Sequence, residues 1–163
     1  MKSLGQGGKI RTVVRFTIKK PTVWPVSHPF YLKLSFMFKA IHHVAIICSD
    51  YQISKKFYTQ VLKLKIIDEN YRFERDSYKL DLALPDGSQI EIFSFPKAPK
   101  RPSFPEAQGL RHLAFEVENV HRVSQYLISH GINVEPIRVD EFTGKSFTFF
   151  QDPDGLPLEL YQK

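Results

Sequence analysis

The stretch His43-Val-Ala-Ile-Ile-Cys-Ser-Asp50 recurs 69 residues further along the chain as His112-Leu-Ala-Phe-Glu-Val-Glu-Asn119. A second pair of similar stretches, Asp86-Gly-Ser-Gln-Ile-Glu-Ile92 and Asp154-Gly-Leu-Pro-Leu-Glu-Leu160, is separated by 68 residues. Each copy therefore carries one histidine and one glutamate at matching places. All four lie in short apolar segments, where a polar side chain is costly to bury without a partner. A shared metal ion would explain the four residues together.

The candidate metal ligands are His43, Glu91, His112 and Glu159. Side chains alternate between the two faces of a strand, so the apolar neighbours of each candidate point to the opposite face. We therefore expect the four side chains to project from one concave sheet. Two imidazoles and two carboxylates suit a divalent first-row ion with positions left open for water or substrate. Each residue alone is more often an exposed or internally satisfied side chain, but the repetition favours a metal site.

The hydrophobic pattern predicts an α+β fold made of two β-α-β-β-β modules. For the first module it predicts strands at residues 38–48, 64–69, 78–84 and 89–95. A helix after Asp50 should turn Ile53, Phe57, Tyr58, Val61 and Leu62 inward. For the second module it predicts strands at residues 110–117, 134–139, 146–151 and 156–161. The helix after Asn119 should turn Val120, Val123, Leu127 and Ile128 inward and stop at Gly131.

Charge and composition narrow the classes of partner. The net charge is +6, but residues 1–36 hold seven Lys and Arg and no acidic residue, which leaves 16 basic against 17 acidic residues from Met37 onward. A near-neutral fold argues against a nucleic-acid or membrane-surface partner. No apolar run reaches the roughly 20 residues needed to cross a bilayer. The single cysteine, Cys48, excludes an intrachain disulfide and fits a reducing compartment, so we expect a cytoplasmic protein. By parity, Cys48 points away from His43 and should be a buried thiol.

The expected domain organisation follows from the same patterns. Residues 37–163 should form a single domain, with modules at 37–95 and 109–163. The proline-rich segment 96–108 should be a stiff connector or a wall of the site, because proline does not fit a sheet interior. We expect residues 1–36 to be a basic extension outside the fold and assign it no function. A targeting peptide and a nucleic-acid or membrane arm are the alternatives for this extension.

The four candidate ligands, the paired modules and the ending Asp152-Pro-Asp-Gly-Leu-Pro-Leu-Glu-Leu160 together resemble the vicinal oxygen chelate superfamily, and within it the glyoxalase I-like proteins. Finer segments at residues 75–79, 101–107, 109–115 and 137–140 are similar to the small bacterial YaeR-type branch, which is labelled lactoylglutathione lyase-like. The resemblance implies a homodimer. It also implies one divalent ion per site, nickel, zinc, cobalt or manganese, with His43, Glu91, His112 and Glu159 as ligands.

The resemblance further implies a lyase or isomerase that transfers a proton through a metal-bound enediolate. The substrate class would be a hemithioacetal of methylglyoxal and a thiol, or another small α-hydroxycarbonyl compound. Glu159 would be the principal base and Glu91 its counterpart. Arg75, Lys79 and Lys145 are the expected substrate-binding residues, with Arg72 and Arg111 as further candidates. Classical bacterial glyoxalase I has an arginine where this chain has Ile47, so the resemblance does not establish glutathione as the thiol.

Two alternatives remain open on the same fold. One is a non-catalytic small-molecule-binding or resistance protein. The other is an epimerase of the methylmalonyl-CoA type, which usually has glutamine at the position of Glu91. Fosfomycin-type transferases and ring-cleaving dioxygenases generally use a set of three ligands, so Glu91 disfavours both.

Overall fold

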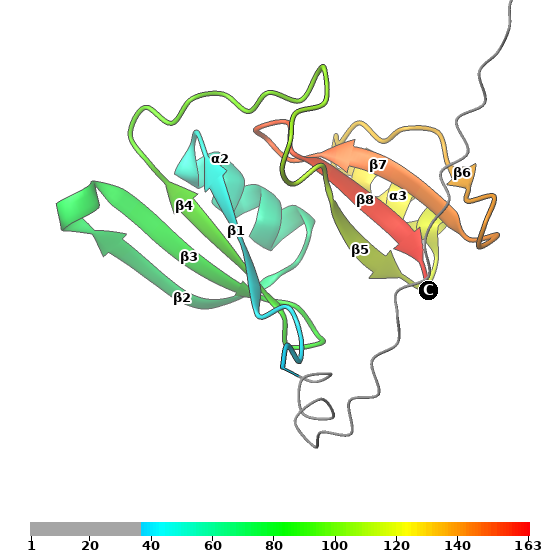
Figure 1. Cartoon of the computed structure of the whole chain (residues 1–163), viewed down its shortest axis with the longest axis horizontal. Helices are drawn as coiled ribbons and strands as arrows, with labels where there is room; N and C mark the ends of the chain where they lie inside the picture. Colours follow the sequence, from blue (N-terminus) through cyan, green and yellow to red (C-terminus); the bar gives the residue numbers. More distant parts are fainter. Residues whose placement is uncertain (1–36) are drawn as a thin grey trace, which may run out of the picture. The chain divides into compact units, whose positions relative to one another are not determined.

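The first module is a four-stranded sheet with one helical segment packed on a single face. The computed structural model describes residues 37–163 (Figure 1), and the expectations made for residues 1–36 lie outside them. The chain forms β1 (His43–Cys48), α2 (Tyr51–Lys56), the π-helical turn η1 (Phe57–Val61), β2 (Lys65–Arg72), the 3-10 turn η2 (Phe73–Arg75), β3 (Ser77–Ala83) and β4 (Gln89–Ser94). The strand order is β1-β4-β3-β2, with β1 parallel to β4.

The second module repeats this arrangement. Its elements are β5 (Leu113–Val117), α3 (Val120–Ser129), β6 (Arg138–Val139), β7 (Ser146–Gln151) and β8 (Pro157–Gln162), with strand order β5-β8-β7-β6 and β5 parallel to β8. The predicted α+β fold of two β-α-β-β-β modules is therefore confirmed. The modules form two separate sheets and not one continuous sheet. No helix within residues 37–163 is long and apolar enough to span a membrane.

The alternation predicted for the ligand-bearing strands is present. Ile90 and Ile92 on β4 are buried while Glu91 between them faces the other side of the sheet. On β1, Cys48 is buried, as predicted, and the side of the strand that carries His43 is exposed. The buried apolar core lies between the sheets and the helical segments and consists of Ile46, Cys48, Tyr51, Phe57, Tyr58, Leu80, Leu82, Ile90, Ile92, Val120, Leu127, Phe150, Leu156, Leu158 and Leu160.

The helices begin where predicted, but one residue on each faces the wrong way. Asp50 caps α2 and Asn119 caps α3 through side-chain oxygens, and Gly131 follows α3 with a φ of +77°. Ile53 and Ile128, predicted to face inward, are 56% and 58% exposed. In each helix an adjacent residue, Ser54 or Leu127, is buried instead. Adjacent helical residues differ by about 100° in direction, so only one of the two can face the core. In the first module, the π-helical turn η1 also adds a residue that breaks the 3.6-residue period.

Three predicted strands are at least three residues shorter than expected, and one of them, β5, begins at Leu113 and not at residue 110. Strand β1 begins at His43 and not at residue 38, because its partner β4 begins at Gln89, the residue paired with His43. Strand β6 covers Arg138–Val139 and not residues 134–139. Pro136 interrupts the longer pairing, because proline has no N–H to donate. Before it, the Glu135 N–H still donates to the Phe149 carbonyl at 2.8 Å.

Hydrogen bonds join the two modules into one unit. Residues Ala40–Lys163 form a single compact body. The buried Tyr58 hydroxyl donates to Oδ2 of Asp152 at 3.0 Å, and the Tyr126 hydroxyl donates to the Val61 carbonyl at 3.0 Å. Burial raises the pKa of Asp152. Burial also raises the pKa of Tyr58, and the nearby Asp152 carboxylate raises it further. The side chain of Asp152 therefore connects the turn before β8 to the first module.

Candidate metal centre

The first candidate ligand pair lies on adjacent parallel strands. His43 opens β1 and Glu91 lies in the middle of β4, where it pairs with Ala45. Nε2 of His43 is 3.5 Å from Oε2 of Glu91, with side-chain exposures of 43% and 15%. The parallel register brings the two side chains together from positions 48 residues apart in the sequence.

The second pair repeats this geometry on the other sheet. His112 immediately precedes β5, and Glu159 lies on β8, paired with Ala114. Nε2 of His112 is 3.0 Å from Oε2 of Glu159, which is largely buried. The His112 ring meets Phe149 edge to face at 5.2 Å. Its Nδ1 atom is buried and has no hydrogen-bond partner among residues 37–163.

These distances suit two ligands of one ion. If two donor atoms each lie about 2.1 Å from a metal, they are about 3.0 Å apart at an octahedral right angle and about 3.4 Å apart at a tetrahedral angle. The observed separations of 3.0 and 3.5 Å match these values. A neutral imidazole nitrogen and a carboxylate oxygen are also donors that suit a divalent first-row ion. Each His–Glu pair therefore fits half of a metal site.

The two pairs do not come together in one chain. Within residues 37–163, no three His, Cys, Asp or Glu side chains lie close enough to hold one ion. The expectation that all four would project from a single concave sheet is therefore wrong for one chain, because each pair lies on its own sheet.

The two glutamates have different surroundings. Nζ of Lys79, on β3, lies 3.0 Å from Oε1 of Glu91 and also hydrogen-bonds Asp81. Burial lowers the pKa of Lys79, but the hydrogen bonds to Asp81 and Glu91 outweigh it and the net direction is upward. Lys79 therefore stays charged and orients Glu91. Among residues 37–163, Glu159 has no ion pair except the one with His112.

The three expected substrate-binding residues have different surroundings in the structure. Lys79 contacts Glu91, as described. Nζ of Lys145 lies 5.9 Å from the centre of the Tyr161 ring, which is two residues beyond Glu159 on β8. Arg75 is exposed in the turn η2 and makes no hydrogen bond or ion pair with a candidate ligand within the described part of the chain. Lys79 is thus the one of these three that touches a candidate ligand.

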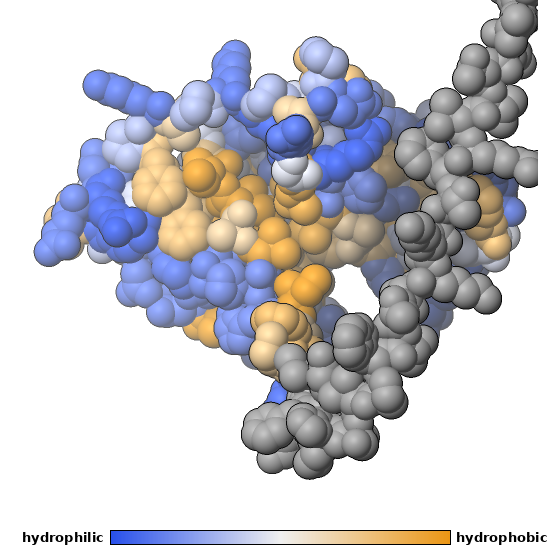
Figure 2. Space-filling view, viewed as in Figure 1, coloured by the Kyte–Doolittle hydropathy of each residue, from blue (hydrophilic) through white to orange (hydrophobic). Residues whose placement is uncertain are grey.

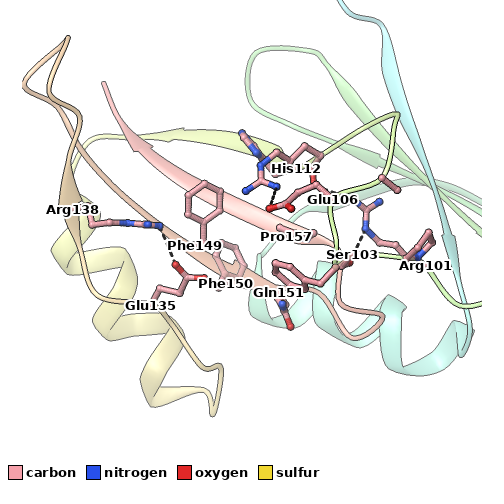
Figure 3. Close-up of a pocket in the computed structure, with 14 residues that line it drawn as sticks. Arg101, Ser103, Glu106, His112, Glu135, Arg138, Phe149, Phe150, Gln151 and Pro157 are labelled. Carbon is pink, nitrogen blue, oxygen red and sulfur yellow. Dashed lines mark hydrogen bonds and ion pairs between the residues drawn. The ribbon is translucent and has the colours of Figure 1, made fainter. Parts of the chain in front are cut away.

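A pocket of about 260 Å³ adjoins the second pair. Figure 3 shows His112 and Phe149 between the linker on one side and Glu135 with Arg138 on the other. The linker supplies Arg101, Pro102, Ser103, Phe104, Glu106 and Ala107 to the pocket. This segment therefore forms a wall next to a candidate ligand, which is one of the two roles predicted for it, the other being a stiff connector.

Arginines hold the walls of this pocket in place. The Arg101 guanidinium donates to the carbonyls of Leu110 and Arg111 at 2.7 and 3.0 Å, which closes the linker loop. Arg138 pairs with Glu135 at 3.0 Å and lies 5.4 Å from the Phe149 ring centre. Sequence reasoning missed Arg138 and Phe149 as site residues. The sequence carried no direct signal for Phe149, because its place opposite Glu159 depends on the register between β7 and β8.

The ligand-bearing side of β1 is apolar and exposed. Ile47, two strand positions on from Ala45, is 54% exposed, and Ile41 just before β1 is 72% exposed. Figure 2 shows apolar side chains gathered across the middle of this face, with hydrophilic side chains around them. Apolar surface of this kind is typical of an interaction site.

The family model described as Glyoxalase/Bleomycin resistance protein/Dioxygenase superfamily matches residues 40–160. The chain is 58% identical to YwkD of Bacillus subtilis (strain 168), with 78% of this chain and 99% of that protein covered. It is 55% identical to YaeR of Escherichia coli (strain K12), with 77% and 97% covered, which confirms the predicted branch. The crystal structure of a glyoxalase family protein from Enterococcus faecalis is similar, with a TM-score of 0.72, 55% identity, and 76% and 98% covered.

Proposed function

Because this chain belongs to the Glyoxalase/Bleomycin resistance protein/Dioxygenase superfamily, we propose that it is a metal-dependent lyase or isomerase of the glyoxalase I type. It would transfer a proton at a carbon next to a carbonyl group of a small molecule, such as a hemithioacetal of methylglyoxal and a thiol. The observation that carries this proposal is the repeated His–Glu pair, with Nε2–Oε2 separations of 3.5 and 3.0 Å.

A second copy of the chain would complete each metal site. One chain offers two half-sites, and no group of three metal-binding side chains forms within residues 37–163. In a two-fold symmetric dimer, His43 and Glu91 of one copy would meet His112 and Glu159 of the other, giving two equivalent four-ligand sites. The exposed apolar side of β1 supports such a contact, since burying it favours association.

The surroundings of the ligands suggest a division of roles. A bound divalent ion would polarise the substrate carbonyl and so acidify the neighbouring C–H bond. Lys79 holds Oε1 of Glu91, so this glutamate is a fixed ligand. Glu159 has no such cation among residues 37–163 and is free to move and take the proton, which makes it the better base.

The pocket beside His112 would hold the remainder of the substrate. Phe149 and the linker residues Pro102 and Phe104 provide apolar contacts, while Arg101 and Arg111 provide charged ones. Enclosure by the linker would exclude water from the site. This would keep the transferred proton from solvent and would strengthen the electrostatic interactions inside the site.

Metal content and turnover test the proposal together. The purified chain, Glu159→Gln, and the control Glu118→Gln in the exposed turn after β5, where Glu118 pairs with Lys163, would be loaded with nickel, zinc, cobalt or manganese and analysed for metal. Each would then be assayed with methylglyoxal and a panel of small thiols. About one ion per chain, with turnover lost in Glu159→Gln and kept in Glu118→Gln, is the expected result. Metal without turnover would favour a binding protein, and no metal under any loading would overturn the proposal.

A further inference from the structure

Arg72 lies on the same side of the first sheet as Glu91. It ends β2, opposite Ser77 on β3. Its guanidinium carbon is 4.7 Å from the centre of the Phe93 ring and 5.4 Å from that of Phe95. Phe93 is two residues beyond Glu91 on β4, and residues two apart on a strand share a face. The guanidinium is therefore stacked on the ring next to a candidate ligand.

In the part of the chain that the structure describes, the charge of Arg72 has no carboxylate partner. Its Nε and Nη2 atoms donate to Oγ of Ser77 at 3.2 and 2.7 Å. No acidic side chain among residues 37–163 lies within 4.0 Å of it, whereas Arg111 pairs with Glu106 and Arg138 with Glu135. A guanidinium has five N–H donors, so Arg72 keeps donors available beyond those that bind Ser77.

The neighbouring cation does not compete for the same role. Nζ of Lys79 lies 5.9 Å from the centre of the Phe93 ring, and Lys79 is on the same side of the sheet as Arg72. Asp81 and Glu91 already neutralise its charge. Arg72 is thus a half-buried cation with no carboxylate within 4.0 Å among residues 37–163, and it lies on the Glu91 side of the first sheet. Holding a guanidinium away from bulk water is costly unless a counter-charge arrives.

We propose that Arg72 is the binding residue for an anionic oxygen group of the substrate, a carboxylate or a phosphate, at the His43–Glu91 half of the site. This inference rests on the proposed function, because it assigns one end of that substrate. Ser77 and Phe93 hold the guanidinium in one orientation, which leaves a preformed fork for two parallel N–H···O bonds. The substrate would then carry its anionic group on the Arg72 side.

Anion binding measured without any substrate tests this role. Inorganic phosphate and, separately, acetate would be titrated into the full chain at constant ionic strength, after metal removal by a chelator and again after zinc loading. Binding would be followed through the Nε–Hε signals of the arginines in ¹H–¹⁵N spectra. The matched variants are Arg72→Gln, Arg72→Lys and the control Arg122→Gln, which removes the same charge from an exposed position on α3.

The expected result is a saturable shift of the Arg72 signal with at least one of the two anions. Arg72→Gln should weaken that binding at least about tenfold and Arg72→Lys by a smaller factor, since lysine keeps the charge and loses the fork. Arg122→Gln should change it less than about twofold. The Arg72→Lys variant carries the test if Arg72→Gln does not fold, as judged by its urea midpoint. An Arg72 signal unmoved by both anions, or equal effects of the Arg72 and Arg122 substitutions, would overturn the inference.

The outcomes separate this inference from the proposed function. Phosphate or acetate binding that depends on Arg72 in a chain that binds no metal would keep the anion site and reject the metalloenzyme. Metal-dependent turnover in a chain whose anion binding is indifferent to Arg72 would do the reverse. The comparison of the two anions also distinguishes a carboxylate from a phosphate as the preferred group.

Discussion

Nζ of Lys79 lies 3.0 Å from Oε1 of Glu91, whereas Glu159, the equivalent glutamate of the second module, has no lysine or arginine within 4.0 Å among residues 37–163. These two glutamates occupy matching places in the repeat, but their side chains differ in the number of ion pairs that hold them. Glu91 is held from two sides, by Lys79 and by His43. Of the described side chains, only His112 forms an ion pair with Glu159.

Substitution of the two glutamates should have unequal effects on turnover. With the metal-loaded protein and an active hemithioacetal substrate, Glu159→Gln should lower kcat about 100-fold or more, because it removes the proposed base. Glu91→Gln should lower kcat by about tenfold, through weaker metal binding. Steady-state kinetics at equal concentrations of protein and added metal, with the metal content of each sample measured alongside, would show both. Equal losses in kcat would argue against the assignment of Glu159 as the base.

Mixing two defective variants should restore metal sites. His43→Ala and His112→Ala each remove one ligand from every proposed site, so each alone should bind little metal. When equal amounts are unfolded together and refolded, half of the dimers are mixed, and each mixed dimer has one complete site of two. The mixture should therefore recover about a quarter of the wild-type metal content. Recovery close to zero would indicate that the sites are not shared between copies.

Loss of the Tyr58 hydroxyl should destabilise the fold. In Tyr58→Phe, the buried Oδ2 of Asp152 loses the hydrogen bond donated at 3.0 Å, which should lower the free energy of unfolding by about 1–3 kcal/mol. Tyr126→Phe removes the other hydroxyl that joins the modules, where a half-buried carbonyl is the acceptor. Its effect should be smaller, about 1 kcal/mol. Urea unfolding of the three proteins would measure the difference, and an unchanged midpoint in Tyr58→Phe would contradict the prediction.

The stability of the fold should depend on pH through Asp152. Burial raises the pKa of its carboxyl in the folded state, above about 3.9 in the unfolded chain. The folded state therefore binds the proton more tightly. This contribution to stability is complete below pH of about 4 and is lost as the pH rises through the folded pKa. Relative to Asp152→Asn, the wild type should lose stability between pH 3 and pH 7 in urea titrations.

Glu69 provides a control, because its contribution to stability should change with pH in the opposite direction. Hydrogen bonds from Lys55 and Tyr51 lower the pKa of Glu69. Its contribution is present above the unfolded pKa of about 4.3 and is lost as the pH falls through the folded value. Relative to Glu69→Gln, the wild type should therefore gain stability over the same rise in pH. A curve for Asp152→Asn that runs parallel to the one for Glu69→Gln would show that burial does not raise the Asp152 pKa.

The faces of the strands could be predicted from the sequence because their period is two. Glu91 and Glu159 each lie between buried residues, and the predicted opposition of Cys48 and His43 is observed. Helix faces were less certain. Ile53 and Ile128 lie one position from the inward row, where small rotations or the extra residue of η1 decide exposure.

The division of the candidate site could not be predicted in the same way. Repetition identifies equivalent residues, but it does not say which modules face each other, and the four candidates form two pairs in one chain. The role of Lys79 next to Glu91 depends on register across β3 and β4, where Asp81 pairs with Glu91. Such cross-strand neighbours become visible only once the pairing of strands is known.

The repeated pair also says something about ancestry. Each module contains one histidine and one glutamate in contact, so a polypeptide of half this length would carry every type of donor in the proposed site, and two identical copies would supply all four ligands. Fusion of two such copies in one gene allows each half to accumulate its own substitutions. The two halves of this chain differ at one such position, because Phe147 pairs with β8 at the place where Lys79 pairs with β4. The repeat is therefore symmetric in its candidate ligands and asymmetric in the charge beside them.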